Sequence, residues 1–405
     1  MFKKYQFELN SSLNDLGIKR FCYQLLQHAS VHKVYVDQVD HRKVTVHYLE
    51  TKKIGEIRNE IDRFLTHHWY AKEQQSVAND YESVSNEEHF ESNDLCSCTF
   101  PVNDSDISAE LLRTGWIKMI REQDLQFSVE IIRLLEWFDT SYVSYISERL
   151  HNVTEVKHNS LIPKYYMEKM NYFQSSPKHL FFPSHLNNDS LDQFTAKTVS
   201  NNGKLPNDVN LHLDSPNYVL QSAPCFKIYF SLENQNLEHN QIYNIRGECY
   251  RNEGKRIYMM ERLNQFSMRE FIFIGTPEFV IEHKRKILQW TIDWMEKLGI
   301  KGHCAHANDP FFIDDQARNN FNIPSNIKVE VKAEIPYKQD SLSIASFDTH
   351  GDFFSKTFNF NMANQKETWS GCMGLGIERC VWSFLQQYGL NCELWPEAVR
   401  DLVYA

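Results

Sequence analysis

The second half of the chain is dominated by strand-like runs, and this pattern limits the possible folds more than any other feature. In chain order, the runs are "FKIYFSLE", "QIYNIRGECY", "QFSMREFIFIGT", "KVEVKAEIPY" and "SLSIASFD". One amphipathic helix, "EFVIEHKRKILQWTIDWMEKLG", interrupts them and ends at Gly299, because glycine commonly follows the last helical turn. Long strands of the antiparallel type with helices grouped around them indicate an α+β domain.

Composition and periodicity divide the chain into three parts. Residues 1–70 follow a β-α-β-β-α order, which predicts a small N-terminal α/β sandwich domain. Its role stays open. Residues 71–106 are acidic and rich in Ser and Asn, which indicates a linker or surface loop. Residues 107–405 form one continuous domain, with helices expected over 108–121 and 127–150.

Composition and charge limit the class of protein. The 405 residues are 42% hydrophobic and 24% charged, which is typical of a soluble globular protein, and no run is long enough to span a membrane. The first residues lack the apolar core of a secretory leader, and the nine cysteines follow no regular spacing, so we expect a cytoplasmic protein. The net charge of -10 disfavours extended contact with nucleic acid, which needs a basic face.

One predicted hairpin, "NIRGECYRNEGKRIYMMERLNQFSMREFIFIGT", carries residues suited to a nucleotide. Arg246 and Glu248 project from one face of the first strand, and Phe266 and Glu270 from one face of the return strand. Arginine pairs with phosphate, an aromatic ring stacks on a base, and a carboxylate holds an amine or a metal. A solvated hairpin with surface ion pairs is the alternative.

A second segment, "SGCMGLGIERCVWSF", joins two glycines to a helix. Arg379 falls in the first turn of a helix that begins near Gly376. Glycine lets backbone approach a ligand, and a helix N-terminus favours anions, so the arginine suits a terminal phosphate. The alternative is a tight turn in which Arg379 pairs with a neighbouring side chain such as Glu378.

These segments resemble the motifs of a known enzyme class. "IRGECYRNEG…ERLNQFSMRE" resembles motif two of class II aminoacyl-tRNA synthetases, "GLGIERCVWSFLQQYG" resembles motif three, and "LIPKYYMEKMNYF" resembles the dimer-forming motif one. Over about residues 107–405 the chain is most similar to amino acid:[carrier protein] ligases, stand-alone relatives of the archaeal, zinc-dependent seryl-tRNA synthetase core. "KMNYFQSSPKHLF", "SAPCFKIY" and "ANDPFF" fit that subgroup. The resemblance implies a class II antiparallel sheet flanked by helices.

The resemblance also implies roles for single residues in binding ATP. Arg246 would contact the α-phosphate and the transition state, and Arg379 would hold the γ-phosphate. Glu248 would read the adenine amino edge, while Phe266 would stack on adenine. Magnesium would accompany ATP, but the family's acidic magnesium ligand aligns with a serine, Ser343. Glu334 and Asp348 therefore stay open as substitutes.

The family's zinc ligands fall on Cys225, Glu270 and Cys372, which implies one zinc per chain. Two thiolates and a carboxylate leave one tetrahedral position open, where the α-amine of an amino acid would bind. These three residues are thus also the expected contacts of the amino acid substrate. Without such support, histidines such as His350 are expected to be surface or core residues rather than ligands.

The resemblance implies an ATP-dependent, AMP-forming ligase that acts as a homodimer. We expect it to activate glycine, alanine or serine as the adenylate and to load it onto the phosphopantetheine thiol of a carrier protein. Because the chain is acidic, we expect no tRNA partner. The alternatives are an archaeal-type seryl-tRNA synthetase and a non-catalytic relative that binds or regulates.

Overall fold

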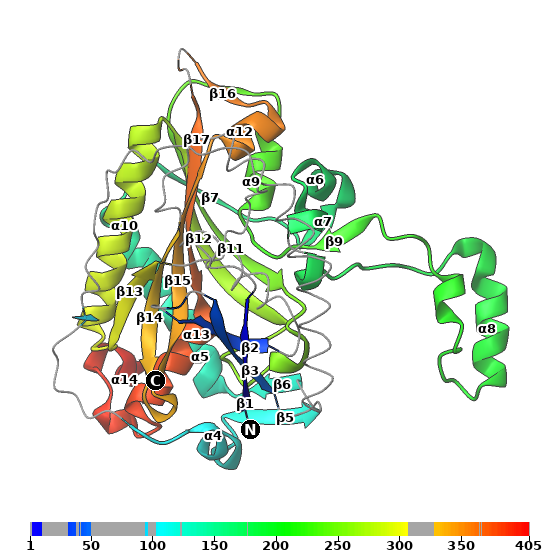
Figure 1. Cartoon of the computed structure of the whole chain (residues 1–405), viewed down its shortest axis with the longest axis horizontal. Helices are drawn as coiled ribbons and strands as arrows, with labels where there is room; N and C mark the ends of the chain where they lie inside the picture. The colour runs from blue at the N-terminus through cyan, green and yellow to red at the C-terminus, as the bar shows by residue number, and fades with distance from the viewer. Residues whose placement is uncertain are drawn as a thin grey trace. The chain divides into compact units, whose positions relative to one another are not determined.

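A computed structural model gives the fold of the chain (Figure 1). The described residues are 2–9, 31–37, 40, 42–49, 94–95, 103–121, 124–175, 177–306, 328–363, 365 and 367–404. They belong to two compact units, each treated by itself below. The first unit comprises residues 1–91 with 253–256 and 307–309, and the second comprises the remaining residues.

The first unit contains a three-stranded antiparallel sheet in the order β1-β3-β2. Its strands are β1 (Phe2–Glu8), β2 (Val31–Val36) and β3 (Lys43–Leu49). The three strands of the predicted β-α-β-β-α order are therefore confirmed. The two helices of that order, over 11–29 and 54–69, lie outside the described residues.

An eight-stranded sheet forms the centre of the second unit (Figure 1). All neighbouring strands pair antiparallel except β7 and β11, which are parallel. Strand β4 comes from the segment predicted as a linker or loop. The order is β4 (Asp94–Leu95), β13 (Gly302–His306), β14 (Lys328–Ile335), β15 (Asp340–Gly351), β17 (Trp369–Gly376), β12 (Gln265–Gly275), β11 (Gln241–Tyr250) and β7 (Val153–Val156).

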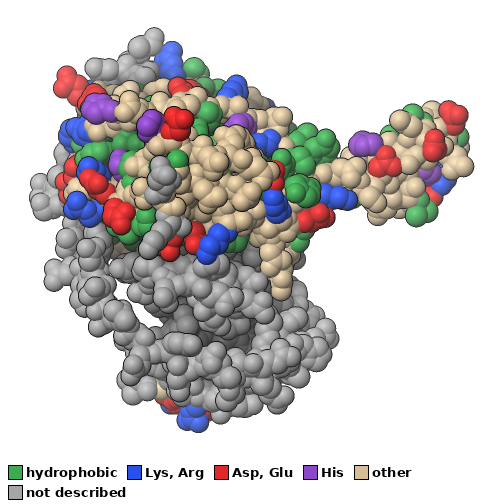
Figure 2. All heavy atoms as spheres, turned by 90° about the horizontal axis from the view of Figure 1, so that it is seen from above, with side chains coloured by type: hydrophobic (Ala, Val, Ile, Leu, Met, Phe, Trp, Pro, Cys, Tyr) green, Lys and Arg blue, Asp and Glu red, His purple; other side chains and the backbone are tan. Residues whose placement is uncertain are grey.

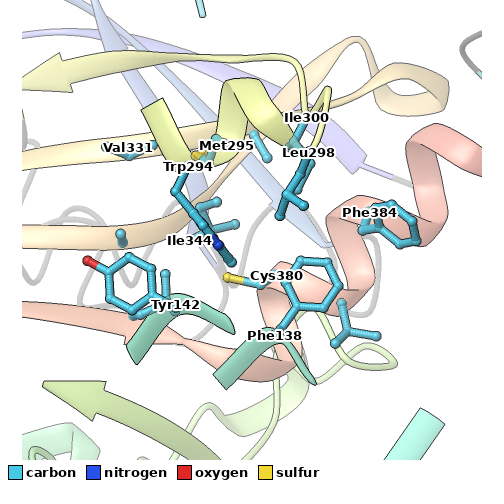
Figure 3. Packing of buried hydrophobic residues seen from close by; sticks show 14 of the residues in the cluster. Phe138, Tyr142, Trp294, Met295, Leu298, Ile300, Val331, Ile344, Cys380 and Phe384 are labelled. Atoms are coloured by element: carbon cyan, nitrogen blue, oxygen red, sulfur yellow. The ribbon is translucent and has the colours of Figure 1, made fainter. Parts of the chain in front are cut away.

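Three long helices cover one face of this sheet: α5 (Val129–Ser147), α10 (Pro277–Lys297) and α13 (Ile377–Tyr388). Their apolar faces meet in a large core in which Phe138, Trp294 and Phe384 pack together (Figure 3). Helix α10 begins where the Thr276 hydroxyl accepts the N–H of Phe279. The predicted amphipathic helix and the helix predicted over 127–150 are confirmed. No helix among the described residues has the length and apolarity to cross a membrane.

Shorter elements pack against the opposite face and around a second apolar core. They include α9 (Phe226–Ser231), α12 (Phe353–Phe358), α6 (Lys164–Lys169), α7 (Tyr172–Ser175), β8 (Leu161–Pro163) and β9 (Tyr218–Leu220). The remaining elements are α4 (Ser108–Thr114), β5 (Ile117–Arg121), β6 (Asp124–Phe127), α8 (Leu191–Ser200), β10 (Asn236–Leu237), β16 (Asn361–Met362) and α14 (Glu397–Tyr404). Helix α8 projects away from the sheet in Figures 1 and 2.

Two predicted elements are wrong. The run "FKIYFSLE" forms helix α9 rather than a strand, because its aromatic residues Phe226, Tyr229 and Phe230 recur at helical spacing and are all buried. The helix predicted over 108–121 ends at Thr114, where Gly115 takes a φ of 78° that terminates the helix. The residues after it form the antiparallel hairpin β5–β6.

Candidate active site

Two thiols and a carboxylate meet on the face of the sheet opposite the three long helices. Glu270 of β12 and Cys372 of β17 share this face, because Cys372 pairs with Ile272, two residues along the strand from Glu270. Cys225 stands at the start of α9, where its N–H donates to Glu270 Oε2 over 2.6 Å. Its loop packs closely on β11, since a Cβ at Gly247 would lie 3.0 Å from Pro224. We call Cys225, Glu270 and Cys372 the trio.

Burial disfavours the charged form of each member of the trio. It raises the pKa of Glu270 to about 7, partly offset by hydrogen bonds from Cys225. Burial also raises the pKa of the Cys225 thiol well above its ordinary value, and the contact with Cys372 adds to this. For Cys372, the hydrogen bond with Cys225 lowers the pKa, but burial and the Glu270 charge outweigh it. Three acidic groups in such a setting need a cation to ionise together.

The trio is chemically suited to zinc. Two thiols and a carboxylate are the ligand types that zinc prefers, and both thiols are free rather than joined in a disulfide. Among the described residues, no group of three or more His, Cys, Asp and Glu side chains stands in the geometry of a formed metal site. The fit therefore rests on the donor chemistry and on the contacts between the three side chains.

His350 extends the trio, although its sequence context gave no sign of this. Its Nε2 lies 3.6 Å from Cys372 Sγ, and the side chain is buried with 5% of its surface exposed. Burial, together with the positive charge of Lys284, lowers the pKa of the imidazole to about 3. The ring is therefore neutral, with one nitrogen available as donor and the other as acceptor.

Arg246 lies on the wrong face of the sheet for the role expected from the sequence. It pairs with Arg269 across β11 and β12, whereas Ile245 pairs with Glu270, so the two arginines face α5. Both nitrogens of its guanidinium terminus bind Glu136 at 2.9 Å, and one also binds Asp139 at 3.2 Å. The structure thus uses Arg246 to fasten α5 to the sheet and does not bring it to the trio.

Glu248 shares the helix-covered face with Arg246. It accepts a hydrogen bond from the Ser267 hydroxyl at 2.9 Å, and Glu378 of α13 accepts the Ser267 N–H at 2.9 and 3.0 Å. Burial, and to a lesser extent the negative charge of Glu248, raises the pKa of Glu378 to about 7. This carboxylate pair lies away from the trio, so the expected contact of Glu248 with adenine does not fit the observed face.

Arg251 is the arginine that the structure brings to the trio's face, and our sequence reasoning missed it. Its guanidinium donates to the Ser222 carbonyl at 2.9 and 3.1 Å and lies 5.1 Å from the centroid of the Phe266 ring. Its charge also lowers the pKa of Glu270. The signal was a second Arg-x-Glu pair, Arg251 and Glu253, directly after the one we chose. Arg246 and Arg251 are an odd number of positions apart, so their side chains project from opposite faces of the sheet. Only Arg251 projects from the face that carries Glu270.

Phe266 lies on the same face of the sheet as the trio, whereas Arg379 lies at the start of helix α13. Phe266 precedes Glu270 by four residues on β12 and so shares its face. Arg379 lies in the first turn of α13 and donates to the carbonyls of Glu261 and Ser343 at 2.9 and 3.0 Å. Its guanidinium thus contacts the backbone of Ser343.

The two substitute magnesium ligands differ in position. Asp348 pairs with Cys372 in the sheet, and its charge raises the pKa of Glu270 and of Cys372. Glu334 pairs with Ser341 nearer the end of β14 and is exposed. Of the two, Asp348 lies beside the trio.

The class of fold follows from the sheet with its flanking helices and from comparison with known proteins. The model of the tRNA synthetase class II core domain (G, H, P, S and T) matches residues 216–388. M. kandleri SerRS, solved with A. aeolicus tRNASec, matches with a TM-score of 0.70 and 20% identity over 99% of this chain and 77% of that one. Seryl-tRNA synthetase from Pyrococcus horikoshii, complexed with ATP, matches with a TM-score of 0.52 and 14% identity. This match covers 82% of this chain and 64% of that one. The chain has the class II aminoacyl-tRNA synthetase fold, as predicted.

Its sequence relatives include archaeal type-2 serine–tRNA ligases. That of Methanococcus maripaludis strain C7 is 26% identical over 300 residues, covering 71% of this chain and 58% of the relative. That of Methanocaldococcus jannaschii is 26% identical over 316 residues, covering 75% of this chain and 60% of the relative. The chain therefore spans somewhat more than half the length of these curated relatives.

Proposed function

We propose that this protein activates a small amino acid with ATP to form an aminoacyl adenylate. The observation that carries the proposal is the convergence, on one face of a class II sheet, of the trio with Arg251 and Phe266. The trio offers a place for an amino acid, and the arginine and ring offer a place for a nucleotide. Serine is the first candidate substrate because the relatives named above are serine–tRNA ligases.

In the proposed reaction, an oxygen of the amino acid carboxylate attacks the α-phosphorus of ATP, and the bond to pyrophosphate breaks. Arg251 neutralises charge that develops on the α-phosphate, Phe266 stacks on the base, and Arg379 holds the terminal phosphate. Bound zinc would accept the α-amine at the trio, and magnesium would share the pyrophosphate charge. Phe266 lies on the face of the sheet that the three long helices do not cover, so its ring is available for such stacking.

Of the possible acceptors of the activated amino acid, tRNA is the one that the comparisons support best. The curated relatives are named as serine–tRNA ligases, and the SerRS of the structural match was solved with a tRNA. This reverses the order of preference that the sequence gave. A protein of this kind would transfer the seryl group from the adenylate to the 3′-terminal ribose of the tRNA.

The thiol of a carrier protein remains a second candidate. A net charge of -10 favours it, because binding tRNA requires neutralisation of several phosphates. On the face seen in Figure 2, the described lysines and arginines are interspersed with acidic side chains rather than gathered into one basic stripe. The resemblance of the sequence to the carrier-protein ligases supports the same acceptor.

One experiment tests activation and another tests the acceptor. Amino-acid-dependent exchange between ATP and pyrophosphate, run across all twenty amino acids, should be highest with serine, alanine or glycine. No exchange with any of them would refute the proposed activation. Enzyme, ATP and the labelled amino acid are then incubated with total tRNA or with holo and apo carrier proteins. Label on tRNA supports the first acceptor, and hydroxylamine-labile label on holo carrier alone supports the second.

We propose further that the catalytic unit is a homodimer with one zinc per chain. The segment that resembles motif one forms β8, α6 and α7, where Leu161 and Tyr165 are exposed large apolar side chains. Exposed apolar surface of this kind favours contact between protein surfaces. Sedimentation equilibrium of the purified chain measures the oligomeric state directly, and a monomer at micromolar concentration would refute this part.

A further inference from the structure

His350 lies beside the trio, at an irregularity near the end of β15. Strand β15 pairs in register with β17 up to Thr349 and Gly371, but the next pair is Gly351 with Ser370, so His350 is an extra residue. Gly351 takes a φ of 56°, a left-handed conformation that glycine adopts without strain. Asp348 pairs with Cys372, and His350 lies two residues further along the strand, so alternation directs the imidazole to the face of the trio.

The contacts around the ring fix its orientation. Nδ1 lies 3.3 Å from both the Tyr229 hydroxyl and the Ser370 hydroxyl. The ring stands edge-on to Phe354 at 5.0 Å between centroids, and Phe354 stacks on Tyr229 at 3.8 Å. When a hydroxyl donates to Nδ1, the ring proton resides on Nε2, which faces Cys372 Sγ at 3.6 Å.

We infer that His350 is a positioning residue that holds Cys372 for the cation of the trio by donating its Nε2–H to the sulfur. A thiolate ligand that accepts a hydrogen bond has its charge partly compensated and its direction fixed, and such partners tune metal affinity. The inference rests on the proposed function, because it takes the trio to be the metal site. It adds a residue that no ligand pattern in the sequence includes.

The test compares zinc affinity among variants of the full chain. His350→Phe preserves the size and edge-on packing of the ring but removes both nitrogens, whereas His350→Gln restores a donor in place of Nε2. His283→Phe is the matched control, since His283 is also partly buried against aromatic rings and its Nδ1 bonds the Phe279 carbonyl rather than a member of the trio. Competition with a chromophoric chelator should give zinc binding about 10–100-fold weaker in His350→Phe. His350→Gln should recover part of the loss, and His283→Phe should match the parent.

A second readout reports the metal–sulfur bond itself. After substitution with cobalt, the sulfur-to-cobalt absorption bands should shift in His350→Phe and remain unchanged in His283→Phe. A folded His350→Phe protein with parental zinc affinity and unchanged cobalt bands would overturn the inference. If His350→Phe does not fold, the double variant Tyr229→Phe with Ser370→Ala decides, because it keeps the stack on Phe354 but removes both hydroxyls at Nδ1. It should weaken zinc binding several-fold, and unchanged binding would count against the inference.

The same measurements separate this inference from the proposed function. If the parent protein binds zinc and the His350 variants bind it equally well, the positioning role fails while the metal site stands. If the parent binds no zinc at the trio, the metal site and the positioning role both fail. Exchange between ATP and pyrophosphate, measured on the same preparations, then shows whether amino acid activation survives without them.

Discussion

Arg246 and Arg251 are five residues apart but lie on opposite faces of the sheet, so their replacement by alanine should have opposite effects. In Arg246→Ala the lost pair with Glu136 is exposed and contributes about 0.2–1 kcal/mol. Asp139 keeps its two 2.7 Å bonds to Arg269, so it is not left without a charge partner. We therefore expect a loss of about 1–2 kcal/mol in the free energy of unfolding and nearly normal catalysis.

Arg251→Ala should instead remove catalysis and largely spare the fold. A preorganised charge aimed at a reacting phosphate typically contributes at least ~100-fold to the rate. The assay is exchange between ATP and pyrophosphate with the best amino acid, paired with urea unfolding of each variant. Near-normal exchange in a folded Arg251→Ala protein, together with abolished exchange in a stable Arg246→Ala protein, would refute the assignment of faces to functions.

Three further predictions concern the trio, a buried carboxyl group and a buried ion pair. Elemental analysis should find about one zinc per chain, and Cys372→Ser should lower it sharply; full zinc in that variant would place the site elsewhere. Burial raises the pKa of Glu378 from 4.5 to about 7, so the folded state holds this proton more tightly and its stability falls as pH rises through that range. In Glu378→Gln that fall, about 3 kcal/mol, should disappear from urea unfolding measured at about pH 5 and about pH 8. Arg269→Ala leaves buried Asp139 with only its weaker partner Arg246 and should cost about 3–5 kcal/mol on unfolding, whereas a loss below about 1 kcal/mol would contradict the buried pair.

Periodicity along the sequence was sufficient to predict most of the long strands and helices of the second unit. Alternating runs predicted the long strands β11, β12, β14 and β15, and helical spacing predicted α5 and α10. Short apolar runs were not sufficient, because a few consecutive aromatic residues fit a buried strand or a buried helix equally well. Helix α9 is the example: Phe226, Tyr229 and Phe230 recur at helical spacing, but Phe226, Ile228 and Phe230 also alternate as in a strand, and all four are buried.

The site could be predicted only as far as residue type and motif allow. Resemblance selected Cys225, Glu270 and Cys372, and the structure brings them together. The resemblance could not decide between Arg246 and Arg251. The choice depends on which arginine projects from the same face of the sheet as Glu270, and that follows from the pairing register of β11 with β12. His350 was beyond reach because its neighbours Tyr229, Ser370 and Cys372 come from other segments of the chain, and only the fold brings them to the ring.

The trio also determines when the site is completed as the chain folds. Cys225 and Glu270 are 45 residues apart, and Cys372 joins them only after β17 has paired with β12 across the whole of α10, β13, β14 and β15. Contacts that are so distant along the chain form slowly, because a large loop must close before they become favourable. During synthesis, two of the three donors therefore emerge from the ribosome well before the third. If the trio binds a metal ion as proposed, its capture by all three belongs to the end of folding, and a chain interrupted before β17 would expose Cys225 and Glu270 without their partner.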